Sequence, residues 1–226
     1  GSASAGEGGG VGRAPAICYP AVTTFGDPST VTPRLPGPQR RSQLLHCARD
    51  LFATQGFHQT SMNDIAKVAG VTKPVLYQHF TSKRELYREL LDDTGQALQD
   101  TIAKATADAA GPREQVEAGF GAYFRYVAEN RSAYRLLFGS GTRRDPEFAE
   151  VALEVEAMIA DFVAAMIDVD EIDPYHQQLL AYGVVGLAEG ASRHWFTDSE
   201  APIEPELLAR QVAELAWAGL RGVRGP

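Results

Sequence analysis

The chain has 226 residues, of which 44% are hydrophobic, and a formal net charge of −8. This length allows one large domain or two smaller domains, each with a buried core. No apolar run of about eighteen residues occurs, and the N-terminus lacks the basic-then-apolar pattern of a secretory signal, so we expect no membrane span and a cytoplasmic location. The two cysteines, Cys18 and Cys47, do not predict a disulfide or a metal site.

The charges are distributed unevenly along the sequence. Residues 37–88 carry eight basic and three acidic side chains, a net charge of +5, whereas residues 89–226 carry 11 basic and 24 acidic side chains, a net charge of −13. A small basic segment beside a large acidic one is typical of a nucleic-acid-binding module joined to a domain with another role. A solvated charged surface without a partner is the alternative.

The first 36 residues differ in composition from the rest of the chain. They are rich in Gly, Ala, Ser and Pro and have neither helical nor strand periodicity, so we expect a disordered arm over residues 1–36. Beyond Pro38 the pattern becomes helical. The first predicted helix ends at Gly56, and its apolar stripe consists of Leu44, Leu45, Ala48, Leu51 and Phe52.

Two short helices are predicted next, joined by a tight turn. Ser61 and Asp64 have the spacing of a capping box at the start of a helix that stops at Gly70. The following helix is expected over residues 73–80, with a proline in its first turn and Thr72 as its cap. This order predicts a helix-turn-helix unit whose second helix enters the major groove of DNA.

The run "SMNDIAKVAGVTKPVLYQHFTSKRELY" resembles the DNA-binding signature of the TetR family, the tetracycline-repressor-like regulators. The resemblance implies an all-α homodimer, and the helix starts and breakers along this chain predict about nine helices. It further implies a three-helix helix-turn-helix domain, here residues 37–84, and a helical ligand-binding and dimerisation domain, here residues 85–226. In proteins of this kind, ligand entry into the C-terminal domain changes the separation of the two DNA-reading helices.

The resemblance also implies which residues meet operator DNA. Those at base-edge or cap positions are Thr72, Lys73, Pro74 and Tyr77. Those at phosphate-contacting positions are Thr60, Ser61, His79 and Lys83. A lysine can donate to guanine and a proline ring can pack on a thymine methyl group, while hydroxyls and cations suit phosphates. The alternative for each is a solvated surface residue. For Arg34, Arg40 and Arg41, a minor-groove contact and a charged helix start are equally open.

The rest of the chain reads as helices separated by breakers. A long helix is expected from about Ser82 to near Gly111, and a short one covers "AYRLLF" before "GSG". Four further helices are expected to begin with a proline in the first turn, at Pro112, Pro146, Pro174 and Pro205.

Aromatic and sulfur-containing side chains concentrate in the helices that line the ligand cavity in the family. The expected ligand-binding residues are Phe120, Tyr123, Phe124, Phe138, Phe162 and Met166, although such a stripe also suits a plain core. The faces of "VEAGFGAYFRYVAEN" and "EVEAMIADFVAAMI" indicate an apolar effector, and "GVTKPVLYQHF" resembles members that sense fatty acyl-CoA. The polar head group of such an effector could contact Arg125, Arg143 or Arg144. Assorted hydrophobic drugs are the alternative class of effector.

Small residues mark the last two predicted helices as a dimer seam. Gly183, Gly186 and Gly190 let helices approach closely, and Trp195 and Trp217 are the expected large anchors.

No catalytic motif accompanies these features. The five histidines are scattered, and the sequence has no HExxH, CxxC, nucleophile elbow or phosphate loop, so we expect no catalytic residue, metal or cofactor. The expected function is a ligand-responsive DNA-binding regulator, with repression as the commoner behaviour in the family. A regulator of efflux genes that senses hydrophobic drugs and a helical protein-interaction module are the alternatives.

Overall fold

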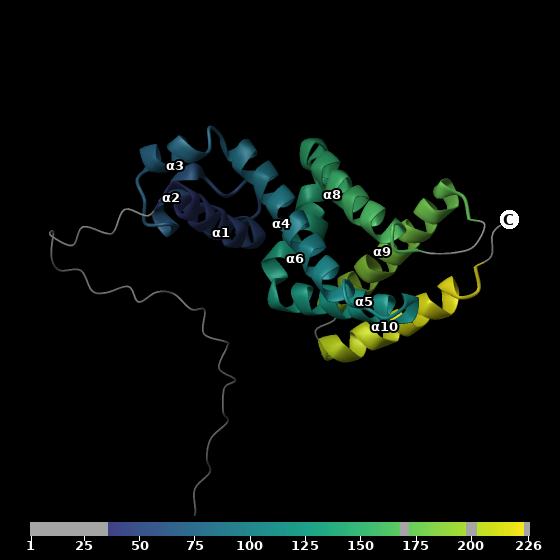
Figure 1. The fold of residues 1–226 in the computed structure, drawn as a ribbon. Helices are drawn as coiled ribbons and strands as arrows, with labels where there is room; N and C mark the ends of the chain where they lie inside the picture. Colours follow the sequence, from purple (N-terminus) through teal and green to yellow (C-terminus); the bar gives the residue numbers. More distant parts are fainter. Residues whose placement is uncertain (1–35, 168–171, 198–202, 224–226) are drawn as a thin grey trace, which may run out of the picture. The chain divides into compact units, whose positions relative to one another are not determined.

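The computed structural model describes residues 36–167, 172–197 and 203–223, and within these ranges all regular structure is helical (Figure 1). The helices are α1 (Gly37–Gln55), α2 (Met62–Val68), α3 (Lys73–His79), α4 (Lys83–Thr106), α5 (Pro112–Glu129), α6 (Arg131–Phe138), α7 (Ser140–Arg144), α8 (Pro146–Ala164), α9 (Pro174–Thr197) and α10 (Pro205–Leu220). The predicted all-α class is confirmed. The nine expected helices are present. A short tenth helix, α7, begins within "GSG", where the sequence predicts only the end of a helix. The predicted arm, apart from Pro36, lies outside the described residues.

The capping box at the start of α2 is confirmed. The hydroxyl of Ser61 accepts the backbone N–H of Asp64 at 3.2 Å, and the Asp64 carboxylate accepts the backbone N–H of Ser61 at 3.1 Å. Hydrogen bonds from Ser61 to the carboxylate hold the pKa of Asp64 below its usual value. The helix stops at Gly70, whose φ of +66° lies in the left-handed region that favours glycine.

Thr72 is the N-cap residue of α3, as predicted, but the prediction that its hydroxyl caps the helix is wrong. Thr72 occupies the N-cap with extended backbone, but its side chain makes no capping hydrogen bond. A capping hydroxyl bonds to the N–H of the second or third residue of the helix. The second residue here is Pro74, which has no N–H, so the proline that favours the helix start also removes one target of the cap.

Helix α4 joins the first three helices to the rest of the chain. It begins at Lys83, where the hydroxyl of Ser82 accepts the N–H of Glu85 at 3.1 Å, and ends at Thr106, earlier than the expected end near Gly111. Gly111 is extended, as the residue before a proline must be, which separates α4 from α5. With 24 residues, α4 is about 36 Å long.

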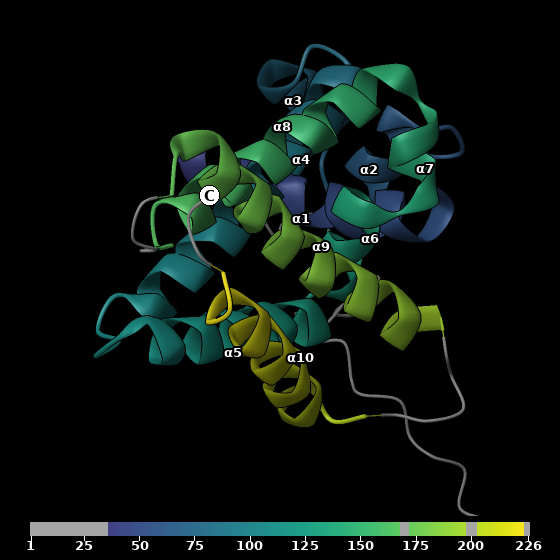
Figure 2. The ribbon, with the colours of Figure 1, turned by 90° about the vertical axis from the view of Figure 1, so that its right-hand side faces the viewer.

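The helices after α4 pack around one another and against it. Figure 2 shows α5 and α10 side by side, while α8 packs on both α4 and α9. The approach of α8 to α4 is close at Gly95, where a Cβ atom would lie 2.4 Å from Cγ1 of Val155. Among the described residues, no helix is long and apolar enough to cross a membrane.

Candidate DNA-binding surface and ligand cavity

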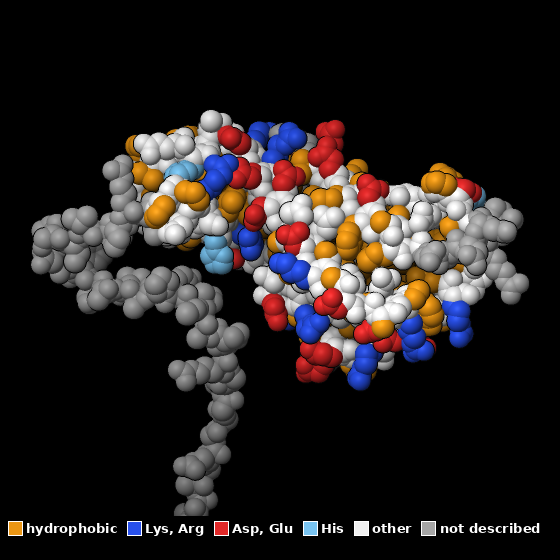
Figure 3. Space-filling model, in the orientation of Figure 1, with side chains coloured by type: hydrophobic (Ala, Val, Ile, Leu, Met, Phe, Trp, Pro, Cys, Tyr) orange, Lys and Arg blue, Asp and Glu red, His pale blue; other side chains and the backbone are white. Residues whose placement is uncertain are grey.

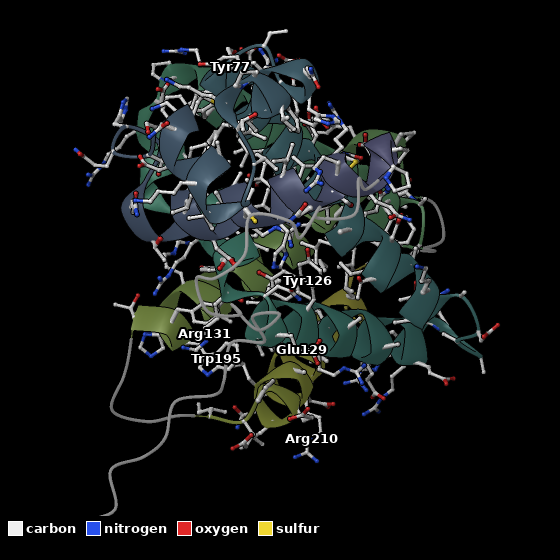
Figure 4. All side chains as sticks on the ribbon, turned by 90° about the vertical axis from the view of Figure 1, so that its left-hand side faces the viewer. Tyr77, Tyr126, Glu129, Arg131, Trp195 and Arg210 are labelled. Atoms are coloured by element: carbon white, nitrogen blue, oxygen red, sulfur yellow. The ribbon has the colours of Figure 1, made fainter. Side chains whose placement is uncertain are left out.

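The first turns of α3 present an exposed polar surface on a buried base. Leu76 and Phe80 are fully buried and fix the helix in the core, whereas Lys73 and Pro74 are exposed. Tyr77, labelled in Figure 4, keeps 45% of its surface accessible, which is high for a tyrosine so close to the core. This arrangement leaves a cation, a proline ring and a phenol free to meet a groove.

Arg41 holds the C-terminal end of α3 in place. Its Nη1 donates to the carbonyl oxygen of His79 at 2.6 Å, its Nε donates to Glu89 at 2.8 Å, and its guanidinium lies 4.4 Å from the centre of the Phe80 ring. The arginine therefore joins α1, α3 and α4, and its charge is already compensated. This geometry favours a structural role over the minor-groove contact that the sequence left open.

Two predicted phosphate-contacting side chains are engaged inside the protein. Thr60 is 1% exposed, and its hydroxyl donates to the carbonyl oxygen of Gly56 at 2.9 Å. The ammonium group of Lys83 donates to the carbonyl oxygens of Phe57 at 2.7 Å and Thr60 at 2.8 Å, and burial lowers its pKa. Both side chains thus fix the loop between α1 and α2, and the phosphate roles expected for Thr60 and Lys83 stay predictions.

The other two predicted phosphate-contacting residues differ in how much of the side chain is available. Ser61 is exposed, but its hydroxyl donates to the carboxylate of Asp64 at 2.6 Å as part of the capping box. His79 is half-buried, with its ring 6.5 Å from the ring of Phe80. The exposed candidates on or next to α3 are thus Thr72, Lys73, Pro74 and Tyr77, with His79 at their edge.

A cavity of about 340 Å³ lies among the C-terminal helices. Its walls come from α4, α5, α6, α8, α9 and α10, and they are largely apolar. On α5 the wall runs from Pro112 to Tyr123, a distance of about 16 Å at 1.5 Å per residue. The volume and lining are typical of a site for a small apolar ligand.

Four of the six predicted ligand-binding residues line this cavity: Phe120, Tyr123, Phe138 and Met166. Phe124 and Phe162 do not line it. Phe124 is fully buried elsewhere, with its ring 5.1 Å from Tyr123 and 6.4 Å from Trp195. Phe124 follows Tyr123, the last cavity-wall residue of α5, and lies one helical turn beyond Phe120, so it packs in the core past the end of the cavity wall.

The last two helices also line the cavity, which the sequence pattern did not predict. Val184, Ala188 and Glu189 of α9 line it, and so do Trp217 and Arg221 at the end of the chain. The small residues of these two helices predict only a dimer interface. The missed signal is that each helix is apolar on two faces, since α9 also carries exposed Tyr175, Leu179 and Tyr182 away from the cavity.

The arginines expected at a polar head group lie outside the cavity wall. Arg143 donates to the carboxylate of Glu189 at 2.5 Å, and Arg125 donates to its own helix at the carbonyl oxygen of Gly121 at 3.2 Å. Arg144 is exposed and does not line the cavity either. Arg221, next to the last turn of α10, is the arginine in the wall.

Comparisons with known proteins agree with this architecture. The family model "Bacterial regulatory proteins, tetR family" matches residues 44–90, and the model "Tetracyclin repressor-like, C-terminal domain" matches residues 112–219. The first match runs from within α1 to the first part of α4, and the second runs from α5 almost to the end of α10.

Three individual proteins illustrate the similarity. The HTH-type transcriptional activator FasR of Mycolicibacterium smegmatis is 33% identical over 192 residues, which cover 84% of this chain and 87% of FasR. The HTH-type transcriptional repressor KstR2 of Mycobacterium tuberculosis is 31% identical over 187 residues, which cover 80% of this chain and 92% of KstR2. The solved structure of the regulator FadR from Bacillus subtilis, in complex with stearoyl-CoA, shares the fold with a TM-score of 0.68 at 16% identity, over 79% of this chain and 98% of that one. The chain therefore belongs to the TetR family of DNA-binding transcriptional regulators.

Proposed function

We propose that this regulator binds its operator as a dimer and is released when an elongated apolar molecule, of the fatty acyl-CoA class, occupies the cavity. The observation that carries the proposal is the cavity itself, whose walls include α4, the helix that continues into the DNA-binding domain. The stearoyl-CoA bound by FadR of Bacillus subtilis, which has the same fold, supports a long acyl chain as the effector. Wall residues spread over about 16 Å of α5 suit an extended chain, with a polar head outside the cavity beside Arg221.

The surface of α3 is the proposed reading surface. Lys73 can donate to guanine, Pro74 can pack on a thymine methyl group, and Tyr77 can reach a base edge or a phosphate. Thr72 and Ser61 lie beside them with exposed side chains, and His79 borders them. Several phosphate contacts by cations would make operator binding fall steeply with salt.

Two helices offer a physical connection between the cavity and the DNA-binding domain. Ile102 of α4 lines the cavity, and the same helix contributes Leu86 and Leu90 to the core next to α1. Ile159 of α8 lines it as well, while Phe148 near the start of α8 packs its ring 4.6 Å from Phe57. A ligand that binds better when α4 and α8 stand further apart would favour the conformation that releases DNA.

The exposed face of the last two helices is the proposed dimer interface. A Cβ atom on Gly183, Gly186 or Gly190 would meet nothing within 4 Å, so this side of α9 has room for a partner helix. Hydrophobic side chains also reach the surface in the region of α8, α9 and α10 (Figure 3). On α10, Leu215 keeps 61% of its surface exposed. Pairing of these faces in two copies gives a four-helix seam.

Repression stays a prediction, because the relatives named above include one activator and one repressor. Release by hydrophobic drugs is the alternative for the effector. The apolar walls suit both classes of effector. We prefer the fatty acyl-CoA class because FadR of Bacillus subtilis, which has the same fold, binds stearoyl-CoA.

Trp217 provides the test, because it is a wall residue and one of two tryptophans in the chain. In a Trp195→Phe background, hexadecanoyl-CoA, hexadecanoic acid and a cationic dye are titrated while the fluorescence of Trp217 is followed. The proposal expects a saturable change with the acyl-CoA that Val163→Phe weakens by narrowing the cavity. A response to the dye alone would overturn the acyl-CoA assignment, and no response to any of them would overturn the effector site.

A further inference from the structure

The wall of the cavity contains a carboxylate that a plain acyl chain would leave unused. Glu189 of α9 lines the cavity with its side chain only 10% exposed. Arg143 donates to its Oε1 at 2.5 Å, and Arg193 lies 3.8 Å from the same oxygen. Among the described residues, no hydrogen bond reaches Oε2. This oxygen is not enclosed by the protein, and Glu189 lines the cavity, so Oε2 can accept a hydrogen bond from a ligand there.

The charges around Glu189 limit what that ligand group can be. Two guanidinium groups already face one carboxylate, so the negative charge is compensated before any ligand arrives. A cationic group would add a third positive charge to this cluster. An anionic group would face the carboxylate itself. A neutral donor satisfies Oε2 without either penalty.

Tyr123 lines the same cavity, and its hydroxyl can complement the carboxylate. Ser192, one turn beyond Glu189 on α9, donates its hydroxyl proton to the Tyr123 oxygen at 3.2 Å. The phenol proton of Tyr123 is then available to an acceptor in the cavity. A group that both donates and accepts can bond to Glu189 and Tyr123 together, and an aliphatic hydroxyl is the simplest such group.

We propose that the cavity recognises an elongated apolar molecule that carries a hydroxyl group at the end near Tyr123 and Glu189, where the hydroxyl bonds to Glu189 Oε2 and to the Tyr123 phenol. This inference rests on the proposed effector function of the cavity. Pro112 and Tyr123 lie about 16 Å apart along α5, so an acyl chain that enters beside Pro112 and Arg221 brings its far end to Tyr123. An ω-hydroxyacyl chain is therefore the ligand class that fits the whole cavity.

The test compares matched ligands on the full chain. Dodecanoyl-, tetradecanoyl- and hexadecanoyl-CoA and their ω-hydroxy counterparts are titrated by calorimetry against wild type, Glu189→Leu, Glu189→Gln and Glu129→Gln. Glu129 is an exposed glutamate of α5 outside the cavity wall, labelled in Figure 4, and serves as the control. Circular dichroism verifies that each variant keeps its helical content.

In wild type and in Glu129→Gln, the hydroxylated chain of best-fitting length should bind about tenfold more tightly than its plain counterpart, as expected for a hydrogen bond to a charged group. Glu189→Leu should abolish this preference while the plain chain still binds. Should Glu189→Leu fail to fold, Glu189→Gln decides, with the preference reduced because its acceptor is neutral. Equal binding of both ligand classes by wild type, or an unchanged preference in the Glu189 variants, would overturn the inference while leaving the proposed function intact. Binding of neither class would instead refute the proposed function.

Discussion

Gly95 lies where α8 packs on α4 without room for a methyl group. A Cβ atom there would lie 2.4 Å from Cγ1 and 2.9 Å from Cγ2 of Val155, far inside normal contact distance. Gly95→Ala must therefore push α4 and α8 apart. If the effector acts through the same separation, this variant should weaken operator binding with no ligand present.

The expected magnitude follows from two opposing effects. Overpacking in a well-packed interior costs about 1–3 kcal/mol. Alanine in place of glycine inside a helix contributes about 1 kcal/mol in the other direction. The free energy of unfolding should therefore fall by about 0–2 kcal/mol. Relief of the clash in the DNA-releasing conformation, worth about 1–3 kcal/mol, should lower operator affinity about 5- to 150-fold.

The assay is fluorescence anisotropy with an operator selected by the protein from a random pool of duplexes, together with urea unfolding. Gly121→Ala is the matched control, since a Cβ atom on Gly121 would meet only Arg125 Nη2, at an ordinary 3.8 Å. It should raise stability by about 1 kcal/mol and leave operator affinity unchanged. Adding Val155→Ala to Gly95→Ala removes the clashing methyl groups and should restore binding. A Gly95→Ala protein that binds the operator like wild type would refute the reasoning.

Three further predictions concern the DNA-binding domain. Tyr77→Ala and Lys73→Ala should each cost about 1–3 kcal/mol of operator affinity, whereas Lys104→Ala, on an exposed part of α4, should not. Fluorescence anisotropy at constant salt measures these affinities. If both variants keep full operator preference, the DNA-reading surface lies elsewhere. Lys83→Ala should lower the free energy of unfolding by about 1–3 kcal/mol, measured in urea, because two carbonyl oxygens lose their donor, and it should keep operator preference. A variant that keeps its stability but loses DNA binding would contradict this structural role and favour the phosphate contact. The capping box should stabilise α2 at pH values above 3.8, the usual pKa of Asp64, and this stabilisation should disappear as the pH falls through the lower pKa of the folded state. NMR titration of the Asp64 carboxyl group measures the direction of the pKa shift. A raised pKa would contradict the prediction.

Features governed by neighbours in sequence were predicted well. Ser61 and Asp64 form their capping box because both partners lie within one turn, and Gly70 ends its helix through its own backbone freedom. The failed cap at Thr72 belongs to the same class. One of the two N–H groups that this cap could reach is missing because the second residue of the helix is Pro74, and that loss can be read from the sequence.

Features set by tertiary packing were not predictable from pattern alone. Thr60 and Lys83 have polar side chains suited to phosphate, and only the fold shows their donors bonded to carbonyl oxygens of the α1–α2 loop. Phe120 and Phe124 are chemically identical and one helical turn apart on the same side of α5, but the cavity wall on α5 ends at Tyr123, and only packing of the other helices sets that limit. Glu189 was missed because a single charge in an apolar helix does not reveal the partner, Arg143, that allows it to be buried.

The central claim is that occupancy of the cavity lowers affinity for the operator. The direct measurement is operator anisotropy for wild type and Val163→Phe, each with and without saturating hexadecanoyl-CoA. The acyl-CoA should weaken operator binding by wild type about 5- to 150-fold, as expected for a coupling free energy of about 1–3 kcal/mol. In Val163→Phe, whose cavity is narrowed, most of this effect should be lost. Equal release of the operator from both proteins, or no release from wild type by an acyl-CoA that binds it, would contradict the account.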